Sequence, residues 1–159
     1  MTPLLVISLL AVPQQALPAV ELDRVVSTVQ TTKIWSSDVR QARLLKLCGP
    51  AVSSDEGILI ELQNRVLVLA EVGRAAGREP TTEELAAHRR AWEQTLGTGE
   101  VESLMTRAGM SARDLQAWHR NDLRIQMYLD GRFGGLAPNP RATRTAEWLG
   151  DLRQRAGLK

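Results

Sequence analysis

The residue types that most often carry catalysis are few in this chain of 159 residues, and they are poorly placed for it. The two histidines, His88 and His119, are far apart in the sequence, and neither has a second ligand at metal-binding spacing. The single cysteine, Cys48, completes no recognisable zinc site with them and has no partner for an internal disulfide. The sequence therefore predicts structural or solvated histidines and no metal site.

Motifs for nucleotide binding or nucleophilic catalysis are also absent from the sequence. There is no G-x-S-x-G turn, no P-loop and no glycine-rich phosphate cradle after a strand. The acidic pairs Glu83-Glu84 and Glu100/Glu102 lie where helices are expected to begin, so the helix dipole explains them without acid–base catalysis. We therefore expect no catalytic residues, no cofactor and no enzymatic activity.

Methionine and large aromatic side chains point to a different chemistry, the binding of apolar polypeptide segments. Methionine adapts its shape and tryptophan offers a large flat surface, so both suit a groove that accepts many sequences. The candidate client-binding residues, all after Pro80, are Trp92, Met105, Met110, Trp118, Met127 and Tyr128. The alternative for each of them is that it fills the core.

The first twenty residues contain no charged side chain, and the chain becomes polar at Glu21. Their apolar stretch, Leu4–Val12, is followed by small residues and is too short to span a bilayer as a helix. This pattern predicts a signal peptide over residues 1–19, cleaved after Ala19 or, as the second choice, after Ala16. Because no Lys or Arg precedes the apolar stretch, a buried N-terminal strand or helix, or a misassigned start, is the alternative.

The remaining chain, residues 20–159, has the size and composition of one globular domain. Hydrophobic residues make up 43% of the full sequence and charged residues 24%, which excludes disorder as the default. The net charge is only +2 and the charges are interspersed, so composition gives little support to nucleic-acid binding. We expect an exported, periplasmic domain without stable membrane insertion, whose stability comes from its core.

Hydrophobic periodicity predicts a mainly α fold with one short N-terminal β-hairpin. The β-branched residues between Asp23 and Trp35 predict two strands hinged near Gln30–Thr32. The second helix that follows is apolar around more than half its circumference, so it is expected to be the central one. The six expected helices are Asp38–Leu47, Ser53–Gly77, Pro80–Gly97, Glu100–Ala108, Ser111–Phe133 and Arg141–Arg155.

Capping patterns and apolar spacing predict finer details of these helices. The expected N-caps are Ser36 or Ser37, Ser53 with Glu56, Thr81 with Glu84, and Ser111 with Asp114. The last helix is expected to bury Ala142, Ala146, Leu149 and Leu152.

Several strings follow one another in a recognisable order. They are LDRVVSTV (Leu22–Val29), SSDVRQ (Ser36–Gln41), ILIELQNRVLVLAEVGRAAG (Ile58–Gly77), PTTEEL (Pro80–Leu85), GMSARDLQAWHRNDLRIQMYLDGRF (Gly109–Phe133) and EWLGDLRQRAGLK (Glu147–Lys159). This order resembles the N-terminal domain of SurA-type periplasmic chaperones, a family that also includes peptidyl-prolyl isomerases. The resemblance implies that the C-terminal end completes the domain beside the first strand.

Two departures from the family pattern stand out. The chain has QTTK at Gln30–Lys33, where the family usually has an Asn/Asp-Gly turn. The residues after Phe133 are too few for a parvulin-type isomerase domain, so isomerase activity is not expected. The resemblance therefore implies an ATP-independent chaperone, or holdase, that binds unfolded or outer-membrane polypeptides in an apolar groove.

Two other functions stay open at this stage. Leu104–Arg120 is similar to a helix-turn-helix, with Arg113, Arg120 and Arg124 placed to face nucleic acid. The export signal and the near-neutral charge argue against this alternative. The other possibility is a structural helical protein that pairs with itself as a homodimer through its Trp-bearing helices.

Overall fold

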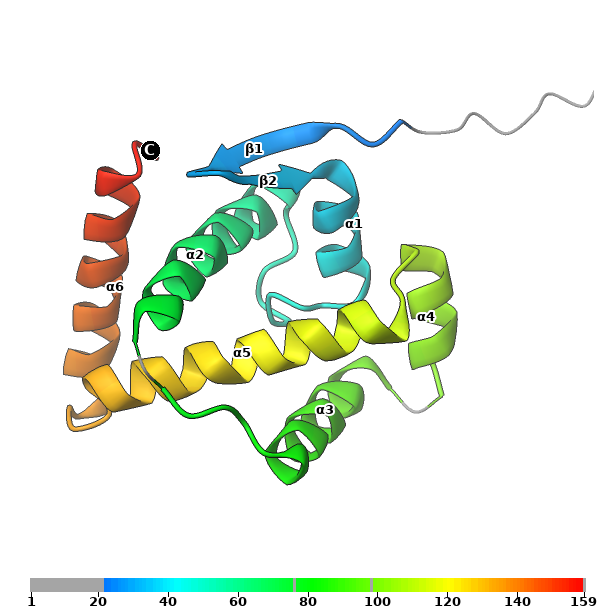
Figure 1. Ribbon diagram of the computed structural model, residues 1–159. Helices are drawn as coiled ribbons and strands as arrows, with labels where there is room; N and C mark the ends of the chain where they lie inside the picture. The colour runs from blue at the N-terminus through cyan, green and yellow to red at the C-terminus, as the bar shows by residue number, and fades with distance from the viewer. Residues whose placement is uncertain (1–21, 76, 98, 159) are drawn as a thin grey trace, which may run out of the picture.

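The computed structural model describes residues 22–75, 77–97 and 99–158. The predicted signal peptide, residues 1–19, lies outside these described residues and stays a prediction. Within them the fold is mainly helical, with an N-terminal β-hairpin followed by six helices, which confirms the expected fold class (Figure 1). The elements are β1 (Val25–Val29), β2 (Thr32–Trp35), α1 (Ser36–Leu44), α2 (Asp55–Arg74), α3 (Thr82–Leu96), α4 (Val101–Ala108), α5 (Ala112–Phe133) and α6 (Pro138–Arg155).

The hairpin forms where the β-branched residues predict it. Its strands are antiparallel, with Val29 opposite Thr32 and Val25 opposite Trp35. A bulge interrupts the register between Val25 and Ser27. The turn puts Gln30 at a φ of 55°, in the left-handed region where the Cβ of an L-residue is disfavoured. The turn is therefore tight even though it lacks the usual glycine.

The start of α1 differs from the predicted Ser36 or Ser37 cap. The N-cap is Trp35, whose backbone N–H donates to Asp38 Oδ2 at 2.7 Å. The hydroxyls of Ser36 and Ser37 instead donate to the carboxylate of Asp23, at 2.8 and 2.6 Å. These hydrogen bonds lower the pKa of Asp23, and the bond from Ser37 has the larger effect. The two serines therefore fasten the entrance of β1 to the first turn of α1.

The other predicted caps agree with the structure, apart from a shift at α2. Its N-cap is Ser54, one residue later than predicted, and its Oγ accepts from the Gly57 N–H at 3.1 Å. Thr81 and Glu84 form the expected capping box at α3. Ser111 caps α5 by accepting from the N–H of Asp114. Local side-chain chemistry thus sets these helix starts.

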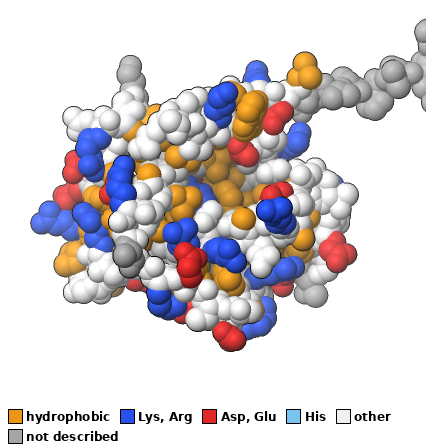
Figure 2. Space-filling view, viewed as in Figure 1, with side chains coloured by type: hydrophobic (Ala, Val, Ile, Leu, Met, Phe, Trp, Pro, Cys, Tyr) orange, Lys and Arg blue, Asp and Glu red, His pale blue; other side chains and the backbone are white. Residues whose placement is uncertain are grey.

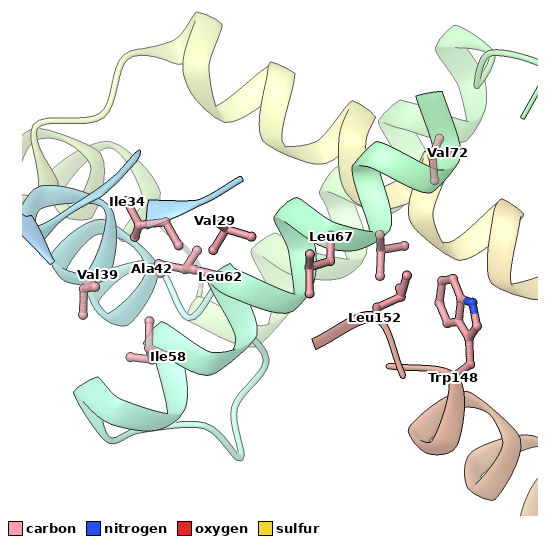
Figure 3. Close-up of a cluster of buried hydrophobic side chains, with 11 residues drawn as sticks. Val29, Ile34, Val39, Ala42, Ile58, Leu62, Leu67, Val72, Trp148 and Leu152 are labelled. Atoms are coloured by element: carbon pink, nitrogen blue, oxygen red, sulfur yellow. The ribbon is translucent and has the colours of Figure 1, made fainter. Parts of the chain in front are cut away.

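The main hydrophobic cluster is built around α2, as its apolar surface predicts. Figure 3 shows side chains of the hairpin and α1 at one end of α2 and side chains of α6 at the other. Its buried members are Val29, Ile34, Val39, Ala42, Ile58, Leu62, Leu67, Val68, Val72, Trp148 and Leu152. Burial on several sides gives α2 the central place in the fold.

The predicted buried face of α6 is partly wrong. Ala142 and Ala146 are exposed, whereas Trp148 and Leu152 are buried. Trp148 and Leu152 are four residues apart and share one helix face, which packs in the cluster around α2. Leu149 is half-buried beside them. The N-terminal half of α6 therefore adds little to the core.

The C-terminal end of α6 lies beside the hairpin, as the resemblance implies (Figure 1). It completes the core by packing, since Val29 of β1 and Leu152 of α6 belong to the same cluster. It adds no strand, because the sheet within the described residues consists of β1 and β2 only. The expected pairing of the C-terminal end with the hairpin is thus, within the described residues, a shared place in the cluster around α2.

Five further residues of the described chain are buried without being members of this cluster. They are Leu45, Leu96, Ala108, Leu115 and His119. They come from the end of α1 and from α3, α4 and α5. In Figure 1, α5 runs between α2 on one side and α3 on the other. The long helix α5 therefore packs against helices on both of its sides.

Candidate functional site

Two neighbouring hollows follow α5 on the side that faces α2. The first, of about 320 Å³, lies between α2, α5, α6 and the segment after α1. The second, of about 430 Å³, lies between α1 and the first half of α5. Leu47, Arg65 and Trp118 line both, so we treat the hollows as one feature, the α5 groove. Figure 2 shows hydrophobic side chains reaching the surface in the middle of this face, between the hairpin and α5.

The lining of the α5 groove is more apolar at one end, where its polar members are Glu61, Asn64, Arg65 and Asp122, and more polar at the other. The apolar side chains of the first hollow are Leu47, Val68, Trp118, Ile125, Leu129 and Leu149. The second hollow has a more polar lining, formed by Asp38, Gln41, Asp114 and Asn121 together with Met110 and Ala117. The groove therefore offers a contact surface that is more apolar at one end than at the other.

Trp118 and Arg65 form the junction between the two hollows. The guanidinium of Arg65 lies over the indole of Trp118, 3.8 Å from its centroid, in a cation–π contact. Arg65 also donates to the backbone carbonyl of Trp118 at 2.7 Å. Arg65 of α2 thus contacts both the backbone carbonyl and the indole ring of Trp118. The orientation of Trp118 is therefore fixed before any ligand binds.

Asp122 joins three helices across the groove wall. Its Oδ1 pairs with Arg65 Nη1 from α2 at 2.7 Å, and its Oδ2 lies 3.0 Å from His88 Nε2 of α3. Gln126 donates to Oδ2 as well, at 3.1 Å. The Arg65 side chain is 12% exposed, and burial lowers its pKa while Asp122 opposes that effect. This pair keeps a buried positive charge compensated.

The structure places the six predicted client-binding residues in three different settings. Trp118 and Met110 line the α5 groove. Met127 and Tyr128 line a separate hollow of about 420 Å³ near the C-terminal end of α2. Trp92 and Met105 are half-buried and line neither hollow of the groove. The structure therefore does not bring the six residues together in one hollow, and their role in client binding stays a prediction.

Trp92 has a structural role at the contact of α3. Its Nε1–H donates to the carbonyl oxygen of Leu45 at 2.9 Å. Its ring meets the edge of His119 at a centroid distance of 4.9 Å. With both its polar group and its ring engaged, Trp92 fastens α3 to the end of α1 and to α5.

Sequence reasoning missed Arg65, Asp122 and the apolar floor residues Ile125 and Leu129. Positions 118, 122, 125 and 129 recur at helical spacing, so they share one face of α5. A charged residue in the middle of that apolar face was the available signal, since an interior carboxylate needs a cation from another element. Only the structure identifies Arg65 as that cation.

Cys48 lines the groove but is a poor nucleophile. Burial first, and then the negative charge of Glu61, raise the pKa of its thiol to about 11. The thiolate is therefore scarce at neutral pH. Cys48 behaves as a small apolar wall residue.

No group of three or more His, Cys, Asp or Glu side chains in the described part of the chain is arranged to hold a metal ion. In the same residues, no helix combines the length and the apolar character that crossing a membrane requires.

The segment similar to a helix-turn-helix does form two helices joined by a turn. Gly109 ends α4 in the left-handed conformation, and Ser111 then caps α5. However, α5 packs against both α2 and α3, and Arg124 pairs with Glu79 at 3.2 Å. Arg113 and Arg120 are exposed. The helix-turn-helix alternative therefore stays a prediction.

Comparison with known proteins gives no relative: no family model, no curated protein and no solved structure matches this chain. The function of the α5 groove therefore has to follow from its own geometry and chemistry.

Proposed function

We propose that this protein is an ATP-independent chaperone that holds extended, apolar segments of exported polypeptides in the α5 groove. The observation that carries the proposal is the groove itself, an open channel with an apolar floor and a pre-oriented tryptophan at its centre. Apolar, adaptable contact surface of this kind suits many client sequences. We also propose that the protein has no enzymatic activity and uses no cofactor.

The length of the groove fits an extended chain. Its lining along α5 runs from Asp114 to Leu129, which at about 1.5 Å per helical residue is roughly 22 Å. An extended segment of about seven residues, at about 3.3 Å each, covers that length. Alternate side chains of such a segment point to opposite sides, so about three or four of them reach the floor.

Binding of this kind is expected to be weak and reversible. Burying a few apolar side chains gives about 1.5–3 kcal/mol each, and ordering the client and losing its free motion cancel much of that. A dissociation constant between about 1 mM and about 0.1 mM, about −4 to −5.5 kcal/mol, is the expected result. A client bound this weakly is expected to leave by folding or by transfer to another protein, without a nucleotide-driven step.

Two features of the sequence support exported clients. The uncharged start with its apolar stretch predicts a signal peptide over residues 1–19. The order of the helical strings resembles that of SurA-type chaperones, whose clients include outer-membrane proteins. We therefore propose unfolded outer-membrane proteins as the first clients to test, and the periplasm as the compartment.

The test uses a groove variant and a matched control on the same helix. Ala117 is exposed and lines the groove, so Ala117→Arg places a long charged side chain in the channel without disturbing the core. Gln116 is exposed and lines neither hollow, so Gln116→Arg adds the same charge outside the channel. Light scattering of a diluted, denatured outer-membrane protein measures suppression of aggregation by each variant.

The wild type and Gln116→Arg are expected to suppress aggregation at comparable concentration, and Ala117→Arg is expected to lose most of that effect. Equal suppression by both variants would place client binding elsewhere on the molecule. No suppression by the wild type would remove the proposal.

A further inference from the structure

His119 is a buried side chain with no polar contact. It is 3% exposed, and neither of its ring nitrogens has a hydrogen-bond partner within the described part of the chain. Its neighbours are two aromatic rings of α3 at steep angles, Trp92 at a centroid distance of 4.9 Å and His88 at 5.2 Å. A neutral imidazole fits this place, whereas an imidazolium ion would have to lose its hydration there without compensation.

The charges that face His119 compensate each other only in part. From α3 come His88, Arg89 and Glu93, and Arg89 pairs with Glu93 at 2.7 Å. From α5 itself comes Asp122, which already pairs with Arg65 of α2. Burial first, and then His88, lower the pKa of His119 from its ordinary value of 6.5 to about 4.

The attachment of α3 depends on a small number of contacts near this histidine. Its polar links to the other helices, within the described residues, are the His88–Asp122 contact, the contact of Gln126 Nε2 with His88 Nε2 at 3.3 Å, and the bond from Trp92 to the carbonyl of Leu45. The buried residue of α3, Leu96, lies outside the main hydrophobic cluster. Local opening of α3 therefore does not require the core around α2 to open.

We propose that α3 is an acid-released cover: uptake of a proton by His119 detaches α3 from α5 and exposes apolar surface that enlarges the client-binding groove. The surface that α3 buries includes its own Leu96 and the contact of Trp92 with His119, which is on the same helix as the groove residue Trp118. Asp122 lines the groove and contacts α3, so the two surfaces meet at that residue. Use of the new surface by clients rests on the proposed function, whereas the release of α3 does not.

The sign and size of the effect follow from linkage. His119 binds a proton more tightly when α3 is open, where its pKa is the ordinary 6.5, than when α3 is closed, where it is about 4. Lowering the pH below 6.5 therefore favours opening, and the effect is complete below about 4. Between pH 7 and pH 5, these values raise the opening equilibrium constant of α3 about 20-fold.

Amide hydrogen exchange of the wild-type protein at pH 7 and pH 5, corrected for intrinsic rates, tests the release directly. The amides of α3 are expected to lose about 20-fold in protection at pH 5, while those of α2 keep theirs. Unchanged protection of α3, or an equal loss in α2 and α3, would overturn the proposal.

Two variants separate proton uptake from simple loosening. His119→Leu removes the buried titrating ring, so the loss of α3 protection at pH 5 is expected to disappear. His88→Gln removes the other histidine and weakens the link to Asp122, so protection of α3 is expected to fall at both pH values while its pH dependence persists. If His119→Leu does not fold, the wild-type exchange data decide alone.

Hydrogen exchange also keeps this inference separate from the proposed function. If α3 is released selectively but client aggregation is not suppressed, the proposed chaperone function is wrong and the acid release of α3 stands. If client aggregation is suppressed equally at pH 7 and pH 5 and the amides of α3 stay protected, the chaperone function stands and the acid release of α3 is wrong.

Discussion

The ion pair of Arg65 and Asp122 gives the sharpest test of how the α5 groove is built. Replacing Asp122 by Ala leaves the guanidinium of Arg65, 12% exposed, without its carboxylate partner. It also removes the partner of His88 on α3. The substitution therefore acts on the contacts of α5 with α2 and with α3 at the same time.

The expected magnitude follows from the burial of the pair. Breaking a fully buried pair by removing one partner costs about 3–5 kcal/mol. The Asp122 side chain is 29% exposed, so water screens part of this interaction, and we expect a loss of about 2–3 kcal/mol in the free energy of unfolding. In a domain of this size, that loss lowers Tm by roughly 5–10 °C.

A double-mutant cycle isolates the pair itself. Urea unfolding, followed by tryptophan fluorescence, is measured for Asp122→Ala, Arg65→Met and the double variant. Arg65→Met keeps much of the side-chain volume and removes the charge that requires compensation. The double variant is expected to be more stable than the sum of the single losses predicts, with a coupling of about 1–2 kcal/mol. Additive losses within about 0.5 kcal/mol would refute the view that the pair holds the groove together.

Three further predictions concern the scaffold. Gln30→Gly is expected to stabilise the protein by about 0.5 kcal/mol in thermal unfolding, because Gln30 has a positive φ, and Thr31→Gly is expected to destabilise it. Ile58→Ala is expected to cost about 2–5 kcal/mol because Ile58 is fully buried, whereas Leu22→Ala is expected to change little because Leu22 is 84% exposed. Since the pKa of Asp23 is lowered in the folded state, its stabilisation is present above the ordinary value of 3.8 and is lost as pH falls through the lowered value. Asp23→Asn is expected to remove that acid dependence, and an unchanged acid limb of the unfolding curve would contradict this.

Much of the helical scaffold was predictable because its signals are local. The capping box of Thr81 with Glu84 and the cap at Ser111 depend on residues three positions apart. The central place of α2 follows from an apolar surface that only burial on several sides satisfies. These features need no knowledge of which helix packs against which.

The start of α1 and the packing of Trp92 depend on long-range contacts, so the sequence could not predict them. Ser36 and Ser37 have the chemistry of caps, but Asp23, from before β1, competes for their hydroxyls. Trp92 has the chemistry of a client contact, but the carbonyl of Leu45 satisfies its indole N–H. Such competition depends on tertiary neighbours, which periodicity and spacing do not reveal.

Site-specific photo-crosslinking tests most directly whether the α5 groove holds extended clients. A benzophenone amino acid is placed at Ala117, in the channel, or at Gln116, on the exposed surface outside it. Each protein is then irradiated with an unfolded or a folded outer-membrane protein. Crosslinks from position 117 to apolar segments of the unfolded client alone are the predicted result. Equal crosslinking from both positions, or none from position 117, would contradict the account.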